Sequence, residues 1–285
     1  MVVDMLMVGT LPSFAAFVAK NPQFCIITPT AYLERFAVQS SMHLVLAHLV
    51  DADQVYADFY ASRKEFKIMD NGAYELGESY DPKKLIELGL KCKADAIVLP
   101  DYPFEPASKT VDAATAMIDA VKDAGFKTMF VPQSEKGDVE DWIKGYVWAS
   151  EMPSIDIIGM SILGIPNALN KIHVGYARVV MTQILIERGI FNFNKYHHYL
   201  GLTSGPKLEI PSLIGMGALD SCDSSGPVWA GICARRYSDA HDSLQAIRKV
   251  ETSVNFDYPL TSNEESILKI IQHNIDMTLE LFNAN

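Results

Sequence analysis

The sequence is poor in cysteine and has no long apolar run. Four of its 285 residues are cysteines, and no two of them stand in the C-x-x-C spacing of a metal or redox site: Cys25, Cys92, Cys222 and Cys233. We therefore expect reduced thiols in a cytoplasmic protein. No apolar stretch approaches the roughly 20 residues that cross a bilayer, and the first residues lack the basic region of a signal peptide. No membrane partner is expected.

Positive charge is also in short supply. Lysine and arginine total 24 against 35 aspartates and glutamates, which gives a formal net charge of -11. This balance argues against a protein that coats nucleic acid through a uniformly basic surface. Either a local basic groove or simple solubility would account for five residues: Lys207, Arg235, Arg236, Arg248 and Lys249.

Phosphate-binding glycine motifs are absent as well, since neither G-x-G-x-x-G nor a P-loop follows an apolar run. What is present is an alternation of short apolar runs with longer helical patterns, in a chain that is 49% hydrophobic and 21% charged. Eight runs predict strands, over residues 24–28, 43–50, 66–69, 96–99, 128–131, 155–160, 198–202 and 217–222. Helices are predicted over residues 30–39, 51–62, 82–91, 108–124, 138–149, 168–188, 206–214, 229–250 and 263–282.

Strand and helix alternating in this way predict an α/β protein of the (β/α)8, or TIM-barrel, class. A doubly wound open sheet is the alternative. After the eighth strand we expect a short C-terminal helical extension, because residues 263–282 have apolar positions at helical spacing. The chain is expected to be a single domain over residues 1–285, with the barrel at about 20–230 and the extension at about 231–285.

Chemistry in barrels of this class takes place where the strands end. Polar residues and glycines follow the last six predicted strands as a carboxylate-rich ring: Asp70, Asn71, Tyr74, Asp101, Gln133, Gly159, Ser161, Gly201, Thr203, Asp220 and Asp223. Each also has an ordinary structural interpretation, such as a turn at residues 70–72 or a helix start at residues 220–223. Their shared location favours function, because several carboxylates at one mouth are costly unless they are used.

Asp70 and Asp223 lie far apart in sequence but at one predicted mouth. A carboxylate pair in a pocket suits cleavage at an anomeric carbon, with one group as nucleophile and the other as acid/base. Asp220 is the alternative nucleophile. No cluster has the spacing of a metal site. His197 and His198 precede the predicted seventh strand and project to its opposite sides, so one of them is expected to face the barrel.

Several segments, in order along the barrel, resemble the tRNA-guanine transglycosylase superfamily. Asp-Asn-Gly-Ala-Tyr-Glu at 70–75 resembles that family's Asp-Ser-Gly-Gly-Phe/Tyr-Gln motif, and Val-Pro-Gln at 131–133 resembles its Val-Gln-Gly segment. Tyr-Leu-Gly at 199–201 and Leu-Asp-Ser-Cys-Asp at 219–223 resemble its Tyr-Leu-Met-Gly-Val-Gly and Asp-x-x-Asp-Cys stretches. Further counterparts are residues 95–101 and 158–160.

The chain departs from the tRNA enzymes of that family in two places. It lacks their C-x-C-x-x-C zinc cluster, with only Cys233 nearby, and Ser-Ser-Gly-Pro at 224–227 replaces Pro-Thr-Arg. His273, in a segment similar to the family's His-Asn, is therefore expected to be structural. These departures make the chain more similar to the phage-type members that insert 7-deazaguanines into DNA.

The resemblance implies a pentosyltransferase that exchanges guanine in DNA for a 7-deazaguanine base through a covalent aspartyl-glycosyl intermediate. It makes Asp223 the nucleophile and Asp70 the acid/base. It assigns substrate binding to Tyr74, Asn71, Asp101, Gln133, Gly159 and Gly201. No cofactor and no metal are implied, the location is the host cytoplasm for a phage-encoded chain, and homodimerisation stays open.

Three alternatives remain. The first is a zinc-free tRNA-guanine transglycosylase of the queuine or archaeosine type. The second is a non-catalytic, nucleic-acid-binding partner subunit, against which the retention of Asp70 and Asp223 argues. The third is an unrelated barrel glycosidase, which would bind sugars through tryptophans at the mouth, where only Trp229 is a candidate.

Overall fold

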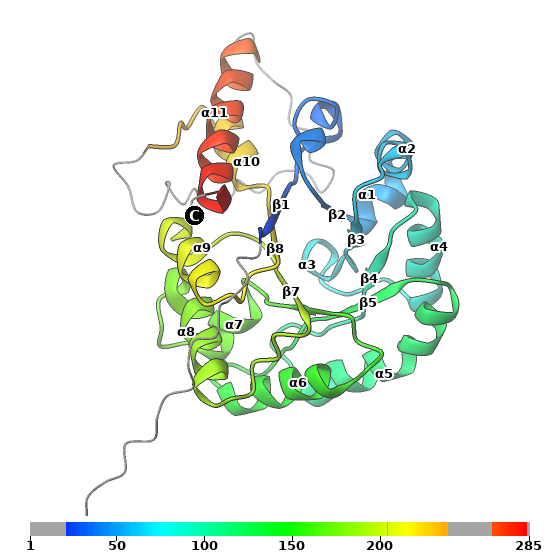
Figure 1. Ribbon diagram of the computed structural model, residues 1–285. Helices are drawn as coiled ribbons and strands as arrows, with labels where there is room; N and C mark the ends of the chain where they lie inside the picture. Colours follow the sequence, from blue (N-terminus) through cyan, green and yellow to red (C-terminus); the bar gives the residue numbers. More distant parts are fainter. Residues whose placement is uncertain (1–20, 204, 239–263, 284–285) are drawn as a thin grey trace, which may run out of the picture.

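A computed structural model of the chain describes residues 21–203, 205–238 and 264–283, except for the side chains of Tyr74 and Glu75. Its centre is a parallel sheet of eight strands, arranged as a barrel (Figure 1). The predicted TIM-barrel fold is thereby confirmed. The strands are β1 (Gln23–Ile26), β2 (His43–Val45), β3 (Lys67–Met69), β4 (Ala96–Val98), β5 (Lys127–Phe130), β6 (Ile157–Gly159), β7 (Tyr196–Tyr199) and β8 (Ser221–Ser224).

Hydrogen-bonded neighbours run in the order β1-β8-β7-β6-β5-β4-β3-β2, and β1 and β2 contact each other where the ring closes. Nearly all strand residues are buried, because one face fills the barrel and the other is covered by helices. The helices form the outer layer (Figure 1). They are α1 (Ala47–Ala52), α2 (Gln54–Ser62), α3 (Ala73–Leu76), α4 (Pro82–Cys92), α5 (Ala107–Asp123), α6 (Val139–Glu151), α7 (Gly164–Ala168), α8 (Val174–Glu187), α9 (Pro206–Gly215), α10 (Gly226–Ile232) and α11 (Glu264–Asn283), with 3-10 turns η1 (Thr30–Tyr32) and η2 (Ala37–Gln39).

Aspartate N-caps begin several of these helices. The side chain of Asp81 accepts the amide of Lys84 at 3.0 Å, with Pro82 in the first turn, as its sequence predicts. Asp53 caps α2 in the same way, accepting the amide of Val55 at 2.9 Å.

Two predicted elements differ from the structure near the amino terminus of the barrel. The apolar run 43–50 is not one strand, because β2 ends at Val45 and α1 begins two residues later. The helix predicted over 30–39 is two separate 3-10 turns. The first error arises because the fully buried run 43–50 has no polar face, so its periodicity does not separate strand from helix.

The C-terminal helix α11 packs on α10 and reaches β1, which confirms the predicted helical extension. A methyl group on Gly231 would lie 2.4 Å from Cγ1 of Ile271, so the two helices approach as closely as they do only because this residue is glycine. Asn274 of α11 donates to the carbonyls of Pro227 and Arg235. Most of the helix predicted beyond Ile232 lies outside the described residues.

The described part of the chain contains no helix that is both long and apolar enough to cross a membrane.

Candidate active site at the carboxyl ends of the strands

Side-chain directions along β7 show which residues face the inside of the barrel. Nε2 of His197 lies 2.9 Å from the Tyr146 hydroxyl of α6, and the Tyr199 hydroxyl lies 2.8 Å from Thr182 of α8, so both residues point outward. His198, between them, therefore points inward. This confirms that one histidine of the pair faces the barrel.

Inside the barrel, His198 joins two residues of β8. Its Nδ1 is 2.7 Å from the Ser221 hydroxyl, and its Nε2 is 3.0 Å from Oδ1 of Asp223. In the tautomer with the proton on Nε2, His198 donates to Asp223, and its Nδ1 accepts the Ser221 hydroxyl. Sequence reasoning did not predict this serine–histidine–aspartate chain, because its members are brought together only by the register of β7 on β8.

The two oxygens of Asp223 have different surroundings. Oδ1 accepts hydrogen bonds from His198 and, at 3.0 Å, from the amide of Gly201. Oδ2 has no hydrogen-bond partner among the described residues. The side chain is almost buried, at 4% exposure for the residue. Asp223 is thus held firmly by one oxygen and has the other available.

Asp220 does not lie with Asp223. The apolar run predicts a strand over 217–222, but β8 begins at Ser221, so Asp220 stands at the amino-terminal end of the strand. Its Oδ2 accepts the amide of His197, near the start of β7, at 2.8 Å. The placement of Asp220 at the mouth and its role as alternative nucleophile are therefore wrong.

The segment after β3 forms the predicted turn and contributes a second group to the mouth. Oδ2 of Asp70 accepts the amide of Gly72 at 3.2 Å, and Gly72 has a positive φ of 81° that favours glycine. Asn71 is buried and donates through Nδ2 to the carbonyl of Leu99 at 2.9 Å and to Oδ1 of Asp101 at 2.7 Å. Asn71 therefore links the carboxyl ends of β3 and β4.

Asp101 and Gln133 continue this line to β5. Nε2 of Gln133 donates to Oδ2 of Asp101 at 2.6 Å. Burial raises the pKa of Asp101 above its ordinary value, and the hydrogen bonds from Asn71 and Gln133 only partly oppose the rise. Oε1 of Gln133 is buried without a hydrogen-bond partner among the described residues. An unsatisfied buried acceptor is costly, and it is expected where a ligand or water donates.

The remaining predicted binding residues have mixed outcomes. Gly201 contacts Asp223 through its amide, as described above. Gly159 ends β6, where a methyl group would lie 2.6 Å from Cε of Met129 and 2.8 Å from Val131, so packing alone requires glycine there. Tyr74 belongs to α3, but its side chain lies outside the described residues.

Sequence reasoning missed a buried ion pair behind β6 and β7. Arg178 of α8 and Glu209 of α9 are both fully buried and are 2.7 Å apart. Burial opposes the charge on Arg178, but Glu209 outweighs it, so the pKa of the guanidinium stays above its ordinary value. The detectable signal was a single arginine in an otherwise uncharged stretch of helix, residues 174–186.

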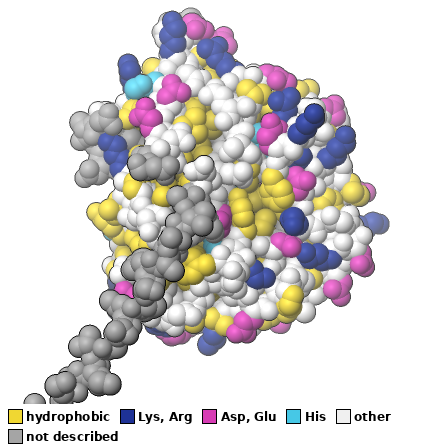
Figure 2. Space-filling model, viewed as in Figure 1, with side chains coloured by type: hydrophobic (Ala, Val, Ile, Leu, Met, Phe, Trp, Pro, Cys, Tyr) yellow, Lys and Arg dark blue, Asp and Glu magenta, His cyan; other side chains and the backbone are white. Residues whose placement is uncertain are grey.

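A local basic groove, one of the two explanations left open for the five basic residues, is not seen on the face drawn in Figure 2. On the face seen in Figure 2, basic and acidic side chains are interspersed, with hydrophobic side chains between them. Arg236 contacts Nδ1 of His273 at 3.2 Å, and Nε2 of that histidine is 3.1 Å from the Tyr237 carbonyl, in keeping with a structural role for His273. Arg248 and Lys249 lie outside the described residues. Trp229 is buried in α10, so no exposed tryptophan supports the glycosidase alternative.

No group of three or more His, Cys, Asp or Glu side chains within the described ranges is arranged to hold a metal ion. Burial raises the pKa of the Cys25 thiol, which pairs in register with Asp223, and that of Cys222. Neither cysteine is a thiolate nucleophile at neutral pH.

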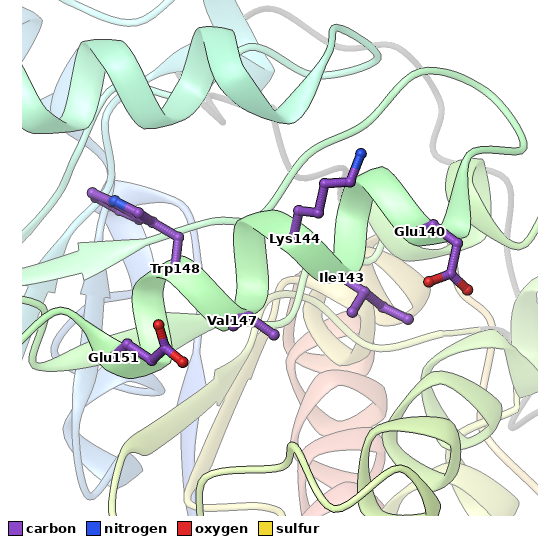
Figure 3. A pocket seen from close by; sticks show the side chains of 6 residues that line it. All are labelled: Glu140, Ile143, Lys144, Val147, Trp148 and Glu151. Carbon is purple, nitrogen blue, oxygen red and sulfur yellow. The ribbon is translucent and has the colours of Figure 1, made fainter.

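A shallow depression on the outer side of α6 is a separate feature (Figure 3). At its edge Glu140 forms an exposed ion pair with Arg188 at 2.8 Å, and Trp148 packs against Phe130 with ring centroids 4.9 Å apart. These contacts attach the helix to its surroundings. The lining residues are Glu140, Ile143, Lys144, Val147, Trp148 and Glu151. None of them belongs to the groups at the mouth.

No family model and no curated protein matches the chain. Solved structures that resemble it include dihydrodipicolinate synthase from Agrobacterium tumefaciens, with 14% identity over 70% of this chain and 68% of that chain and a TM-score of 0.43. An HpcH/HpaI aldolase/citrate lyase family protein from Burkholderia cenocepacia has 9% identity over 72% and 88%, with a TM-score of 0.45. CdNal from Clostridium difficile, in complex with mannosamine, has 9% identity over 71% and 69%, with a TM-score of 0.41.

These findings overturn the assignment to the tRNA-guanine transglycosylase superfamily. No model of that family matches the chain. The interpretation as a pentosyltransferase that exchanges guanine in DNA is wrong. So are its tRNA and partner-subunit alternatives, and DNA, tRNA and a 7-deazaguanine as partners. Short motifs at strand ends misled because polar side chains line the mouths of many unrelated barrels.

Proposed function

We propose that the chain is an enzyme that binds a small polar molecule at the carboxyl ends of its strands and transfers a proton on it, with Asp223 as the reactive carboxylate. The observation that supports this most directly is the asymmetry of Asp223. Oδ1 is held by His198 and Gly201, while Oδ2 has no partner among the described residues. A carboxylate fixed by one oxygen is oriented for acid/base work with the other.

The array of Asn71, Asp101 and Gln133 is the proposed binding group. Both oxygens of Asp101 keep lone pairs beyond the two amide contacts, and Oε1 of Gln133 is an unused acceptor. A matching substrate presents N–H or O–H donors. The array contains no cation, and the buried Arg178 is committed to Glu209 and to backbone carbonyls. We therefore propose a neutral or cationic substrate in preference to a carboxylate or phosphate.

Asp70 is the proposed second acid/base group, because it follows β3 on a different part of the ring from Asp223. In this scheme Oδ2 of Asp223 takes a proton from the substrate and Asp70 returns one to it. Tyr74 and Gly159 remain predicted binding residues, and we retain the whole chain as one domain. The scheme does not include a covalent imine between the substrate and a lysine side chain. Lys67, the buried lysine among the described residues, is at the start of β3, at the opposite end of the barrel.

A ligand screen tests the proposal. Purified protein is heated with amides, amino sugars, polyols and amino heterocycles, with carboxylates and phosphates as the opposing set. We expect a donor-rich compound to raise the melting temperature of the wild type, and to bind about 10-fold or more weakly to Asp101→Asn, as for a lost hydrogen bond to a charged group. Proton NMR should show this compound being converted by the wild type and not by Asp223→Asn.

Two results would contradict the proposal. One is a set of hits confined to carboxylates and phosphates. The other is a donor-rich ligand whose affinity and conversion are unchanged in both variants. Asp119→Asn, an exposed carboxylate of α5, is the matched control and should behave as the wild type.

A further inference from the structure

We propose that the buried ion pair Arg178–Glu209 is a positioning element for Asp223, an inference that rests on the function proposed for that carboxylate. Nε and Nη2 of Arg178 donate to the two carboxylate oxygens of Glu209 at 2.7 and 2.8 Å. This is the bidentate geometry that only arginine provides. The pair joins α8 to α9 where neither side chain touches solvent.

The guanidinium also binds the carboxyl ends of two strands. Nη1 donates to the carbonyls of Met160, after β6, and Leu200, after β7, at 3.1 and 2.9 Å. Nη2 donates to the carbonyl of Gly201 at 2.7 Å. Arg178 therefore fixes the backbone directly behind the mouth, at three carbonyls that follow neighbouring strands.

Gly201 transmits this order to Asp223. Its carbonyl accepts from Arg178, and its amide donates to Oδ1 of Asp223 at 3.0 Å. Its φ of 72° is in the left-handed region, and a methyl group there would lie 3.2 Å from Cγ2 of Ile162, so both backbone conformation and packing favour glycine. One residue thus links the ion pair to the reactive carboxylate.

Glu209 holds the same segment from its other side. Its Oε2 accepts the hydroxyl of Thr203 at 2.9 Å and the amide of Thr203 at 3.3 Å. The two charged partners therefore secure residues 201–203 at both ends. A buried ion pair is often no more stabilising than an apolar pair of the same volume. This pair orients Gly201, and through Gly201 it orients Oδ1 of Asp223. Apolar packing alone would not supply this orientation.

The test reads the Gly201 amide directly in the full chain and needs no substrate. Selective 15N-glycine labelling gives at most 17 glycine amide signals, and the Asp223→Ala variant identifies the Gly201 signal without its carboxylate acceptor. We expect Arg178→Lys to move this signal toward its Asp223→Ala position and to speed its hydrogen exchange at least 10-fold. Lysine keeps the charge but cannot span Glu209 and three carbonyls.

If Arg178→Lys does not fold, Glu209→Gln is the second variant. It keeps the volume of the side chain and most of the hydrogen bonds of Glu209. It should move the Gly201 signal in the same direction by a smaller amount. Arg188→Lys, at the end of the same helix α8, breaks only the exposed pair with Glu140 and should leave the signal unchanged. With the ligand from the screen, Arg178→Lys should lower kcat more than it weakens binding, because the Asn71–Asp101–Gln133 array is untouched.

An unmoved Gly201 signal with unchanged exchange in both Arg178→Lys and Glu209→Gln would overturn the positioning role. So would equal changes at all glycine amides, since these indicate general loosening. Because the amide is read without substrate, a failed ligand screen would contradict the proposed function and leave this result standing.

Discussion

The barrel has aspartates at both ends, and the two sets are built differently. At the amino-terminal end, three aspartates each stand one residue before an even-numbered strand and accept, through Oδ2 at 2.8 Å, an amide near the start of the preceding odd strand. The pairs are Lys67 N to Asp95, Thr128 N to Asp156 and His197 N to Asp220. At the carboxyl end, Asp101 is held by two side-chain amides, and Asp223 has one oxygen without a partner.

The pKa values of two of these groups shift in opposite directions. Burial works to raise the pKa of Asp156, but hydrogen bonds from Lys122 and Thr128 outweigh it, so the pKa falls below its ordinary value. For Asp101 burial prevails, and the pKa rises. Asp156, which joins strands, is thus stabilised as a carboxylate, whereas Asp101, at the mouth, keeps unused hydrogen-bonding capacity at an energetic cost. That unused capacity distinguishes a site for a ligand from a structural contact.

Asp223 in β8 and Asp220 just before it separate the two ends of the barrel most clearly. We expect Asp223→Asn to lower conversion of the screened ligand by about 10²- to 10⁴-fold, the usual contribution of a general acid or base, with little change in melting temperature. Asp220→Asn, three residues earlier, should lower the melting temperature and leave conversion per folded molecule intact. Parallel activity and thermal-unfolding assays measure both effects. Loss of conversion in Asp220→Asn, with a lower melting temperature but normal conversion in Asp223→Asn, would contradict this assignment.

His43 also lies at the amino-terminal end of the barrel, but unlike the three aspartates there it joins no strands. Neither of its ring nitrogens has a hydrogen-bond partner among the described residues. Burial lowers its pKa to about 4. As the pH falls, the unfolded chain takes up this proton first, near pH 6.5. The contribution of neutral His43 to the free energy of unfolding is therefore fully present above about pH 6.5, and about 3 kcal/mol of it is lost as the pH falls toward 4. Urea unfolding should show this loss in the wild type and not in His43→Phe; equal slopes would contradict it.

Asp156→Asn tests the strand-joining role itself. The amide oxygen still accepts from Thr128, but the charge that faces Lys122 is gone. We expect the free energy of unfolding at pH 7 to fall by about 1–2 kcal/mol, as for a hydrogen bond to a charged group. Denaturant unfolding measures it, with Asp119→Asn as the exposed control. A change no larger than that of the control would show that the charge is not needed.

Asp101→Asn should have the smallest effect on stability. The amide removes a buried charge whose pKa is already raised, and rotation of the Gln133 amide offers Oε1 to the new donor. We therefore expect a free energy of unfolding at pH 7 within about 1 kcal/mol of the wild type, or slightly above it. A loss larger than that of Asp156→Asn would place Asp101 with the structural aspartates.

Most of the fold could be read from the sequence, because alternating apolar runs and helical patterns with N-caps such as Asp81 predict a barrel. The boundaries of β8 could not be predicted from the sequence. The run 217–222 is the more apolar, yet the strand is Ser221–Ser224, since a polar sequence inside a barrel mouth is held by ladder hydrogen bonds and by His198. The strand starts four residues and ends two residues later than predicted, and this difference decided which of Asp220 and Asp223 reaches the site.

Other parts of the site depend on contacts between distant segments. Asn71, Asp101 and Gln133 were predicted one by one from strand ends, but their hydrogen-bonded array appears only when β3, β4 and β5 are side by side. Arg178 and Glu209 lie on helices, where charge normally indicates a solvated face, and only tertiary packing reveals them as a buried pair. The family resemblance relied on residue types at strand ends, which the fold itself favours.

A crystal structure of the protein with the ligand from the screen would show whether the substrate binds at Asp101, Gln133 and Asp223. We expect the ligand at the carboxyl ends of the strands, with its donors on Asp101 and Gln133 and a reacting atom within hydrogen-bond distance of Oδ2 of Asp223. A ligand bound instead on the outer side of α6, or at the mouth with no contact to Oδ2, would contradict it.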